Sequence, residues 1–86
     1  MTLFTVSVIV PVYNGSRTIR DCLEALLAQD YPQDHYEIIV VDNNSSDATP
    51  RLVSAYSRVT LLHQREVQSS YASRNQGARC ARGEIL

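Results

Sequence analysis

Two short runs of β-branched and other apolar residues constrain the fold of this chain more than any other feature. Thr5 to Val12 reads TVSVIVPV, and Glu37 to Val41 reads EIIVV. Nearly continuous apolar runs of this length are typical of strands that are buried on both faces of a sheet. Such sheets are covered by helices on both sides, so the sequence predicts an α/β protein.

A stripe of apolar residues at helical spacing follows the first strand. It consists of Ile19, Cys22, Leu23, Leu26 and Leu27. This spacing predicts an amphipathic helix whose apolar side packs on the sheet. Ser16 is expected to cap the start of this helix, and Tyr31-Pro32 is expected to stop it. Pro11 is expected to end the pairing of the first strand, because proline has no backbone N–H.

The second strand is followed by the same kind of pattern. Leu52, Val53 and Tyr56 supply an apolar face for a second helix, with Asp47 as its expected N-cap. Val59 to His63 is then predicted to form a short third strand.

A third helix is predicted over about Tyr71 to Arg82, and Gly83 is its expected C-cap. Residues 84–86 resemble the opening of a fourth strand. The order βαβαβα(β) predicts a Rossmann-like arrangement of three layers, in which a mostly parallel sheet lies between helices.

Composition limits the classes of function. The chain has 86 residues, of which 44% are hydrophobic and 20% are charged, and this is ordinary for one folded domain over residues 1–86. Its net charge of −1 gives no electrostatic reason to expect a nucleic-acid partner. Cys22 and Cys80 are far apart and predict neither a disulfide framework nor a metal site. Because no signal peptide and no apolar run of membrane length are apparent, the expected location is cytoplasmic.

Several familiar catalytic and phosphate-binding motifs are missing from the sequence. There is no GxGxxG, Walker, HExxH or GxSxG pattern. His35 and His63 have no partner residues nearby in the sequence and are interpreted as surface or packing residues. The polar loops at 13–16 and 42–47 follow the first two strands, and ligands of parallel sheets bind beyond the carboxyl ends of strands. These loops are therefore the predicted ligand site.

Four segments in this order resemble a known family. They are Pro-Val-Tyr-Asn at the end of the first strand, Val-Val-Asp-Asn-Asn-Ser-Ser-Asp after the second, Arg-Asn-Gln-Gly in the third helix, and Ala-Arg-Gly-Glu beyond it. Together they resemble the N-terminal half of the family 2 glycosyltransferases, which have the GT-A fold. The resemblance runs from about Ser7 to Leu86. One departure is Asn43, which stands where many members have a second Asp.

The resemblance implies transfer of a sugar from a nucleotide-diphosphate sugar to an acceptor hydroxyl, with inversion at the anomeric carbon. The metal-binding DxD motif, the acceptor-binding region and the catalytic base of the family would lie beyond Leu86. The chain is therefore expected to be about the first third of a catalytic domain, with no catalytic residue of its own and no activity alone. Mg²⁺ or Mn²⁺ is expected in the full-length enzyme but is not expected to be bound by these residues. The full-length enzyme is expected in the cytoplasm or at the cytoplasmic face of a membrane.

The resemblance also implies a set of nucleotide-binding residues. They are Pro11, Tyr13, Asn14, Asp42, Asn44 and Arg74. Asp42 matches the base-binding Asp of the family, Tyr13 the segment that lines the nucleotide pocket, and Arg74 an Arg that reaches the nucleotide. The alternatives are a loop cap for Asp42, a packing residue for Tyr13 and a solvated helix residue for Arg74.

The chemistry of a carboxylate narrows the choice of nucleotide. Asp42 only accepts hydrogen bonds, so it suits the N–H of uracil, thymine or guanine and disfavours cytosine. The expected donors are therefore UDP-, dTDP- or GDP-sugars, with an unknown acceptor. Self-association through an exposed sheet edge or uncovered helix faces is also expected. The alternatives to a glycosyltransferase are a nucleotide-binding module without transfer chemistry and an NAD-type Rossmann domain.

Overall fold

The computed structural model describes residues 6–29, 32, 35–64, 75, 77–79, 81 and 84–85. The elements in chain order are β1 (Val6–Val12), α1 (Ile19–Leu27), β2 (Tyr36–Asp42), α2 (Thr49–Ser54), β3 (Val59–His63) and β4 (Glu84–Ile85). Residues 75 and 77–79 are also helical. The predicted alternation of strands and helices is therefore confirmed. Ala81, which was predicted to be part of the third helix, is not helical. The other residues of that predicted helix, Arg74 among them, and its expected C-cap Gly83 lie outside the described residues.

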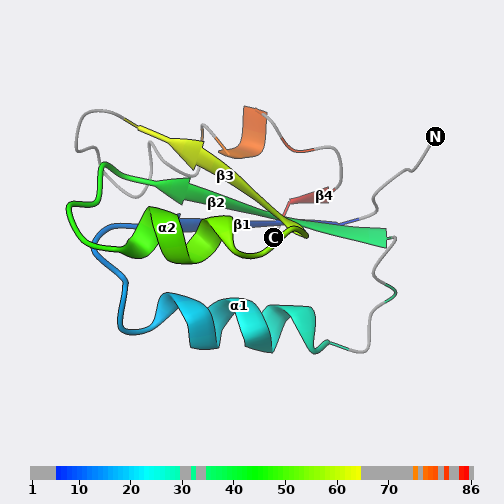
Figure 1. Ribbon diagram of the computed structural model, residues 1–86. Coiled ribbons are helices and arrows are strands. Elements are labelled where there is room, and N and C mark those ends of the chain that lie inside the picture. Colours follow the sequence, from blue (N-terminus) through cyan, green and yellow to red (C-terminus); the bar gives the residue numbers. More distant parts are fainter. Residues whose placement is uncertain are drawn as a thin grey trace.

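The strands form one parallel sheet with the order β3-β2-β1-β4 (Figure 1). Val12 of β1 pairs with Asp42 of β2, and Asp42 pairs with His63 of β3. The carboxyl ends of these three strands therefore lie side by side at one edge of the sheet. In Figure 1 this edge is on the left, where the arrowheads of β2 and β3 point.

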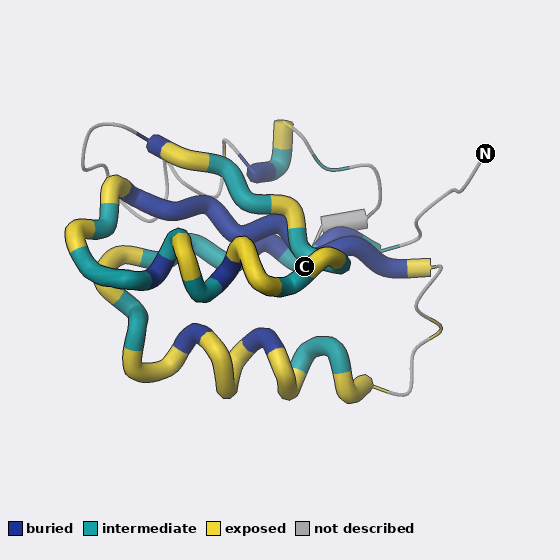
Figure 2. The backbone as a smooth tube through the Cα atoms, viewed as in Figure 1, coloured by how far each residue is buried: buried dark blue, intermediate teal, exposed yellow. Residues whose placement is uncertain are grey.

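Helices cover both faces of the sheet. Both α1 and α2 lie on one face (Figure 1), where Leu23 and Val53 pack with Ile38 and Val40. On the other face lie Ile9, Ile39 and Val41. The helical residue Gly77 lies against Ile9 and Val41 there. Every residue of β2 is buried, and this strand runs through the centre of the molecule in Figure 2. The predicted burial on both faces is confirmed for β2, whereas only Ser7 and Ile9 of β1 are buried.

Helix α1 begins later than the sequence predicts. The carbonyl oxygen of Gly15 accepts the N–H groups of Thr18 and Ile19 at 3.0 and 2.8 Å, and Thr18 is the N-cap. The prediction that Ser16 caps this helix is therefore wrong. The helix also ends at Leu27, before Pro32, and Cys22 of the apolar stripe is exposed. No helix within the described ranges is long and apolar enough to span a bilayer.

Pro11 does not end the pairing of β1, contrary to the prediction. The pairing with β2 continues through Pro11 to Val12, and the N–H of Asn43 donates to the carbonyl of Val12 at 2.8 Å. Since alternate residues of a strand direct their backbone groups to opposite sides, the backbone of Pro11 points away from β2. Among the described residues β4 pairs on that side only with Val6 and Ser7, so the missing N–H interrupts no ladder there.

Candidate functional site at the carboxyl edge of the sheet

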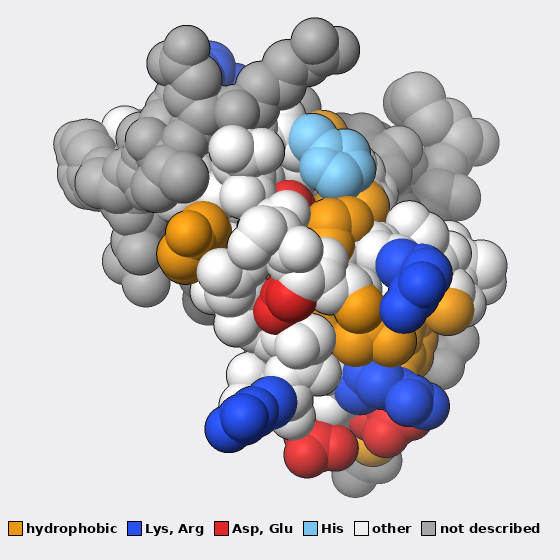
Figure 3. Space-filling view, turned by 60° about the vertical axis from the view of Figure 1, so that its left-hand side comes forward, with side chains coloured by type: hydrophobic (Ala, Val, Ile, Leu, Met, Phe, Trp, Pro, Cys, Tyr) orange, Lys and Arg blue, Asp and Glu red, His pale blue; other side chains and the backbone are white. Residues whose placement is uncertain are grey.

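Two loops lie together at the carboxyl edge of the sheet. One joins β1 to α1 at residues 13–18, and the other joins β2 to α2 at residues 43–48. Figure 3 views the molecule from this end and shows charged and uncharged polar side chains gathered there. This arrangement is the one expected for a ligand site in a parallel sheet.

Hydrogen bonds join the two loops. The N–H of Asn14 donates to Ser45 Oγ at 2.8 Å, and the N–H of Ser46 donates to Asn14 Oδ1 at 2.8 Å. The N–H of Ser16 donates to Asp47 Oδ2 at 3.2 Å. We call these five residues the loop clasp. Because each loop supplies both donors and acceptors, the clasp fixes the position of one loop relative to the other.

Asn14 and Asn44 both have left-handed backbone conformations, with φ of 50° and 59°. Asparagine tolerates this conformation better than most residues. Both side chains are exposed at the edge where they were predicted to bind a nucleotide. The side-chain oxygen of Asn14 is already engaged in the loop clasp, so its first role is to hold the second loop.

Asp47 accepts hydrogen bonds from the first loop and from the start of α2. Its Oδ1 accepts the N–H of Thr49 at 2.9 Å and the Thr49 hydroxyl, while its Oδ2 accepts the N–H of Ser16. The Thr49 hydroxyl, followed by the backbone N–H groups, lowers the pKa of Asp47 from 3.8 to about 2, although partial burial opposes this. The N-cap position of α2 is Ala48 rather than Asp47. Asp47 still satisfies the N–H of Thr49 from one residue earlier.

Asp42 ends β2 and is 1% exposed. Its Oδ2 accepts the N–H of Ser45 at 3.1 Å, so the residue does support its loop. Its Oδ1 is buried and has no hydrogen-bond partner among the described residues. An unsatisfied buried acceptor costs about 1–3 kcal/mol, and more when it is charged. The loop-cap interpretation therefore accounts for only one of the two oxygens.

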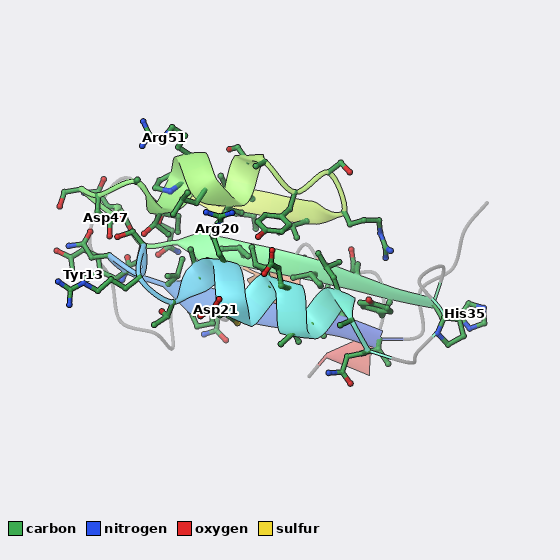
Figure 4. The ribbon with its side chains drawn as sticks, turned by 60° about the horizontal axis from the view of Figure 1, so that its bottom comes forward. Tyr13, Arg20, Asp21, His35, Asp47 and Arg51 are labelled. Carbon is green, nitrogen blue, oxygen red and sulfur yellow. The ribbon has the colours of Figure 1, made fainter. Side chains whose placement is uncertain are left out.

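His63 lies beside Asp42 at the end of the neighbouring strand. Its Nδ1 is 3.7 Å from Asp42 Oδ2, and its side chain is 58% exposed. From the sequence, His63 is expected to be only a surface or packing residue. The residue is on the surface, but it belongs to the site. His35 lies at the opposite end of the sheet from Tyr13 and Asp47 (Figure 4).

Of the other predicted nucleotide-binding residues, Tyr13 and Pro11 are described by the structure and Arg74 is not. Tyr13 is 53% exposed at the carboxyl edge, close to Asp47 in Figure 4, so its ring is accessible. Pro11 is half-buried in β1, one residue before the carboxyl end of that strand. The structure thus brings Pro11, Tyr13, Asn14, Asp42 and Asn44 to one edge. Arg74 lies outside the described residues, and its role stays a prediction.

The described residues do not provide a metal site. Across the described ranges, no group of three or more His, Cys, Asp and Glu side chains lies close enough to hold an ion. Within the site, the Asp47 oxygens and Asp42 Oδ2 already accept hydrogen bonds. Three of the four carboxylate oxygens of Asp42 and Asp47 are thus engaged in hydrogen bonds.

A parallel sheet with helices on both faces and polar loops at its carboxyl edge defines an α/β protein with its ligand site at that edge. The family model described as "Glycosyl transferase family 2" matches residues 7–86, so the chain belongs to that family.

Curated relatives agree with this membership. The chain is 45% identical over 89 residues to the glycosyltransferase AglE of Haloferax volcanii. The aligned residues cover 99% of the chain and 29% of AglE. It is 33% identical over 84 residues to the poly(ribitol-phosphate) beta-N-acetylglucosaminyltransferase TarS of Staphylococcus aureus, covering 93% of the chain and 15% of TarS. The chain thus spans less than a third of the length of these relatives.

Solved structures agree with the fold. Residues 1–349 of S. aureus TarS in complex with UDP-GlcNAc superpose with a TM-score of 0.88 at 31% identity, over 96% of this chain and 25% of that one. The mannosyltransferase PcManGT of Pyrobaculum calidifontis, in complex with GDP-Man and Mn²⁺, gives a TM-score of 0.84 at 35% identity, over 88% and 24%. The expected GT-A-type N-terminal region is confirmed.

Proposed function

We propose that this chain forms the nucleotide-recognising part of an inverting glycosyltransferase, which transfers a sugar from a nucleotide-diphosphate sugar to an acceptor hydroxyl. Membership of family 2 supports the reaction class. The complexes of related proteins with UDP-GlcNAc and GDP-Man support a donor whose base is uracil or guanine. A dTDP-sugar has the same base chemistry as a UDP-sugar and is included in the proposal.

The unpartnered Oδ1 of Asp42 is the observation that carries this proposal. A carboxylate oxygen accepts a hydrogen bond and cannot donate one. The base of UDP, dTDP or GDP has a ring N–H that suits this oxygen, whereas cytosine has an acceptor at the corresponding position. A bound uracil, thymine or guanine would therefore satisfy Oδ1, and cytosine would leave two acceptors facing each other.

The accessible ring of Tyr13 is proposed to stack on the same base. Arg74 is proposed to reach the nucleotide, where its guanidinium suits a base carbonyl or a phosphate. The Mn²⁺ in the PcManGT complex supports a divalent cation in the full-length enzyme, held by residues outside the described ranges of this chain. The proposed location of the full-length enzyme is the cytoplasm or the cytoplasmic face of a membrane.

Substitution of Asp42 in the full-length protein tests the proposal. A hydrogen bond to a charged group contributes about 1.5–3 kcal/mol, so Asp42→Ala is expected to weaken UDP binding roughly tenfold to a hundredfold in calorimetric titration. Asp42→Asn is expected to retain part of the affinity and to bind CDP better than the parent, because its NH₂ donates to cytosine.

N3-methyl-UDP is the matched ligand control, since it lacks the N–H that Asp42 is proposed to accept. The parent is expected to lose affinity for it, and Asp42→Ala is expected to bind it as weakly as UDP. Equal affinity of the folded Asp42→Ala variant and the parent for UDP would contradict the proposal and leave Asp42 as a loop residue only.

A nucleotide-binding module without transfer chemistry is the second candidate. It predicts nucleotide binding without release of UDP or GDP in the presence of a sugar donor and Mn²⁺. Turnover of a nucleotide sugar by the full-length protein would exclude this candidate. An NAD-type domain is disfavoured by the family match, and it predicts that NAD binds more tightly than UDP.

A further inference from the structure

We infer that His63 is a base-recognition residue, which donates a hydrogen bond to the carbonyl that adjoins the base N–H accepted by Asp42. This inference rests on the proposed function of Asp42. It adds a side chain to the same site and names a second group of the base, the carbonyl beside the N–H, that the site would recognise. The site would read a donor and an acceptor side by side, which is the pattern of uracil, thymine and the six-membered ring of guanine.

The position of His63 follows from the register of the sheet. Asp42 and His63 are paired residues at the ends of neighbouring parallel strands, so their side chains lie on the same face. The N–H of Gln64 donates to the carbonyl of Asp42 at 2.8 Å, and this bond holds the end of β3 against the end of β2. His63 is therefore fixed next to Asp42 by backbone pairing rather than by its own side chain.

The two side chains lie close together, and each keeps hydrogen-bonding capacity that the described residues do not use. Nδ1 of His63 lies 3.7 Å from Oδ2 of Asp42, the oxygen that already accepts the N–H of Ser45. This distance is too long for a hydrogen bond, although a protonated imidazole would form an ion pair with Oδ2. The ring N–H groups of His63 are therefore not used in a hydrogen bond to the carboxylate. The other oxygen, Oδ1, has no partner among the described residues, while the imidazole is 58% exposed.

Imidazole can donate from a ring nitrogen in its neutral or protonated form. The pair therefore offers one acceptor, Asp42 Oδ1, and one neighbouring donor. A base with N–H next to C=O matches this pair at both positions. Cytosine mismatches the acceptor, since its ring nitrogen at that position carries no hydrogen.

The test measures how tightly the full-length parent and its His63 variants bind UDP and modified forms of UDP. Comparing the changes in affinity shows whether His63 and a base carbonyl interact. The titrated ligands are UDP, 2-thio-UDP and 4-thio-UDP, in which sulfur replaces one base carbonyl oxygen and accepts hydrogen bonds weakly. The parent is expected to bind one of the two thio-nucleotides about fivefold to tenfold more weakly than UDP. His63→Leu is expected to bind UDP more weakly by a similar factor and to lose the difference between UDP and that thio-nucleotide.

His63→Gln keeps an N–H donor and is expected to restore part of the discrimination. His35→Leu is the matched control, because it makes the same substitution at the exposed opposite end of the sheet (Figure 4). The ratio of the parent's affinity to that of His63→Leu is compared between UDP and each thio-nucleotide. If this ratio is the same for all three ligands, His63 contacts no base carbonyl and the inference is wrong.

The same titrations separate this inference from the proposed function. If N3-methyl-UDP is discriminated through Asp42 while His63→Leu behaves as the parent with every ligand, only the role of His63 is overturned. If the parent binds neither UDP nor GDP, both proposals are overturned together.

Discussion

The two aspartates of the site differ in how much of their hydrogen-bonding capacity the fold uses. Asp47 accepts bonds on both oxygens, from Ser16 of one loop and from Thr49 at the start of α2. Asp42 is more deeply buried, yet it accepts only one bond among the described residues, on Oδ2. The fold therefore uses both carboxylate oxygens of Asp47 in hydrogen bonds and leaves one oxygen of Asp42 for a ligand.

The role of Asp47 leads to a prediction about pH. Its pKa is lowered from 3.8 to about 2, chiefly by the Thr49 hydroxyl, so its carboxylate binds protons less readily in the folded state than in the unfolded state. The stabilisation is therefore complete above about pH 4 and is lost as the pH falls from 3.8 towards 2. Asp47→Asn is expected to be less stable than the parent at pH 7, and the difference is expected to shrink below pH 4.

Urea unfolding at a series of pH values measures this difference. Asp21→Asn is the control, because Asp21 is an exposed aspartate on α1, outside the loop clasp (Figure 4). A stability difference between the parent and Asp47→Asn that stays constant from pH 7 to pH 2 would argue against a bonded carboxylate.

At the scale of elements, the strands were predictable because their sequence pattern is local. The apolar run before Asp42 corresponds to β2, which is buried along its whole length, and the predicted third strand matches β3 residue for residue. The start of α1 was not predictable, because the N–H of Ser16 bonds to Asp47, thirty-one residues away. A hydrogen bond from Ser16 to a loop so distant in the sequence cannot be recognised from the residues around Ser16.

The helical segment at 77–79 leads to a prediction about packing. A Cβ at Gly77 would lie 2.5 Å from Ile9 Cγ2 and 3.2 Å from Val41 Cγ2, both in the sheet. Alanine favours a helix over glycine by about 1 kcal/mol, but overpacking a core costs about 1–3 kcal/mol. Because the clash is with side chains rooted in buried strands, Gly77→Ala is expected to destabilise the protein by about 1 kcal/mol or more.

Chemical denaturation of Gly77→Ala checks this expectation. Arg79→Ala, at an exposed position of the same segment, is the control and is expected to change the stability by less than about 0.5 kcal/mol. An increase in stability for Gly77→Ala would mean that the segment does not pack closely on Ile9 and Val41.

At the scale of the whole molecule, the site could be predicted only where one strand and its loop define it. Asp42 ends β2 and Tyr13 directly follows β1, so the rule for parallel sheets places them at the carboxyl edge. His63 was missed because its partner is twenty-one residues earlier, and only the register of β2 with β3 brings the two together. The hydrogen bonds of the loop clasp were missed for the same reason.

The length of the chain relative to its relatives leads to a prediction about activity. The chain spans 29% of AglE, and its described residues hold no candidate metal site. The 86-residue chain alone is therefore expected to bind UDP without hydrolysing or transferring sugar from UDP-GlcNAc in the presence of Mn²⁺. Metal-dependent release of UDP by the purified chain, absent from an Asp42→Ala preparation, would contradict this expectation.

The edge of the sheet leads to a prediction about association of the same 86-residue chain. Within the described part of the chain, β3 pairs on one side only, with β2, and its Thr60 is exposed. An unprotected edge strand is a template for another strand, and a lysine on the edge opposes such pairing. Light scattering is therefore expected to give a mass that rises with concentration towards a dimer, and Thr60→Lys is expected to lower it. Ser57→Lys, which adds the same charge at an exposed position before β3, should leave the mass unchanged. A monomeric mass for the parent at every concentration would rule out pairing through this edge.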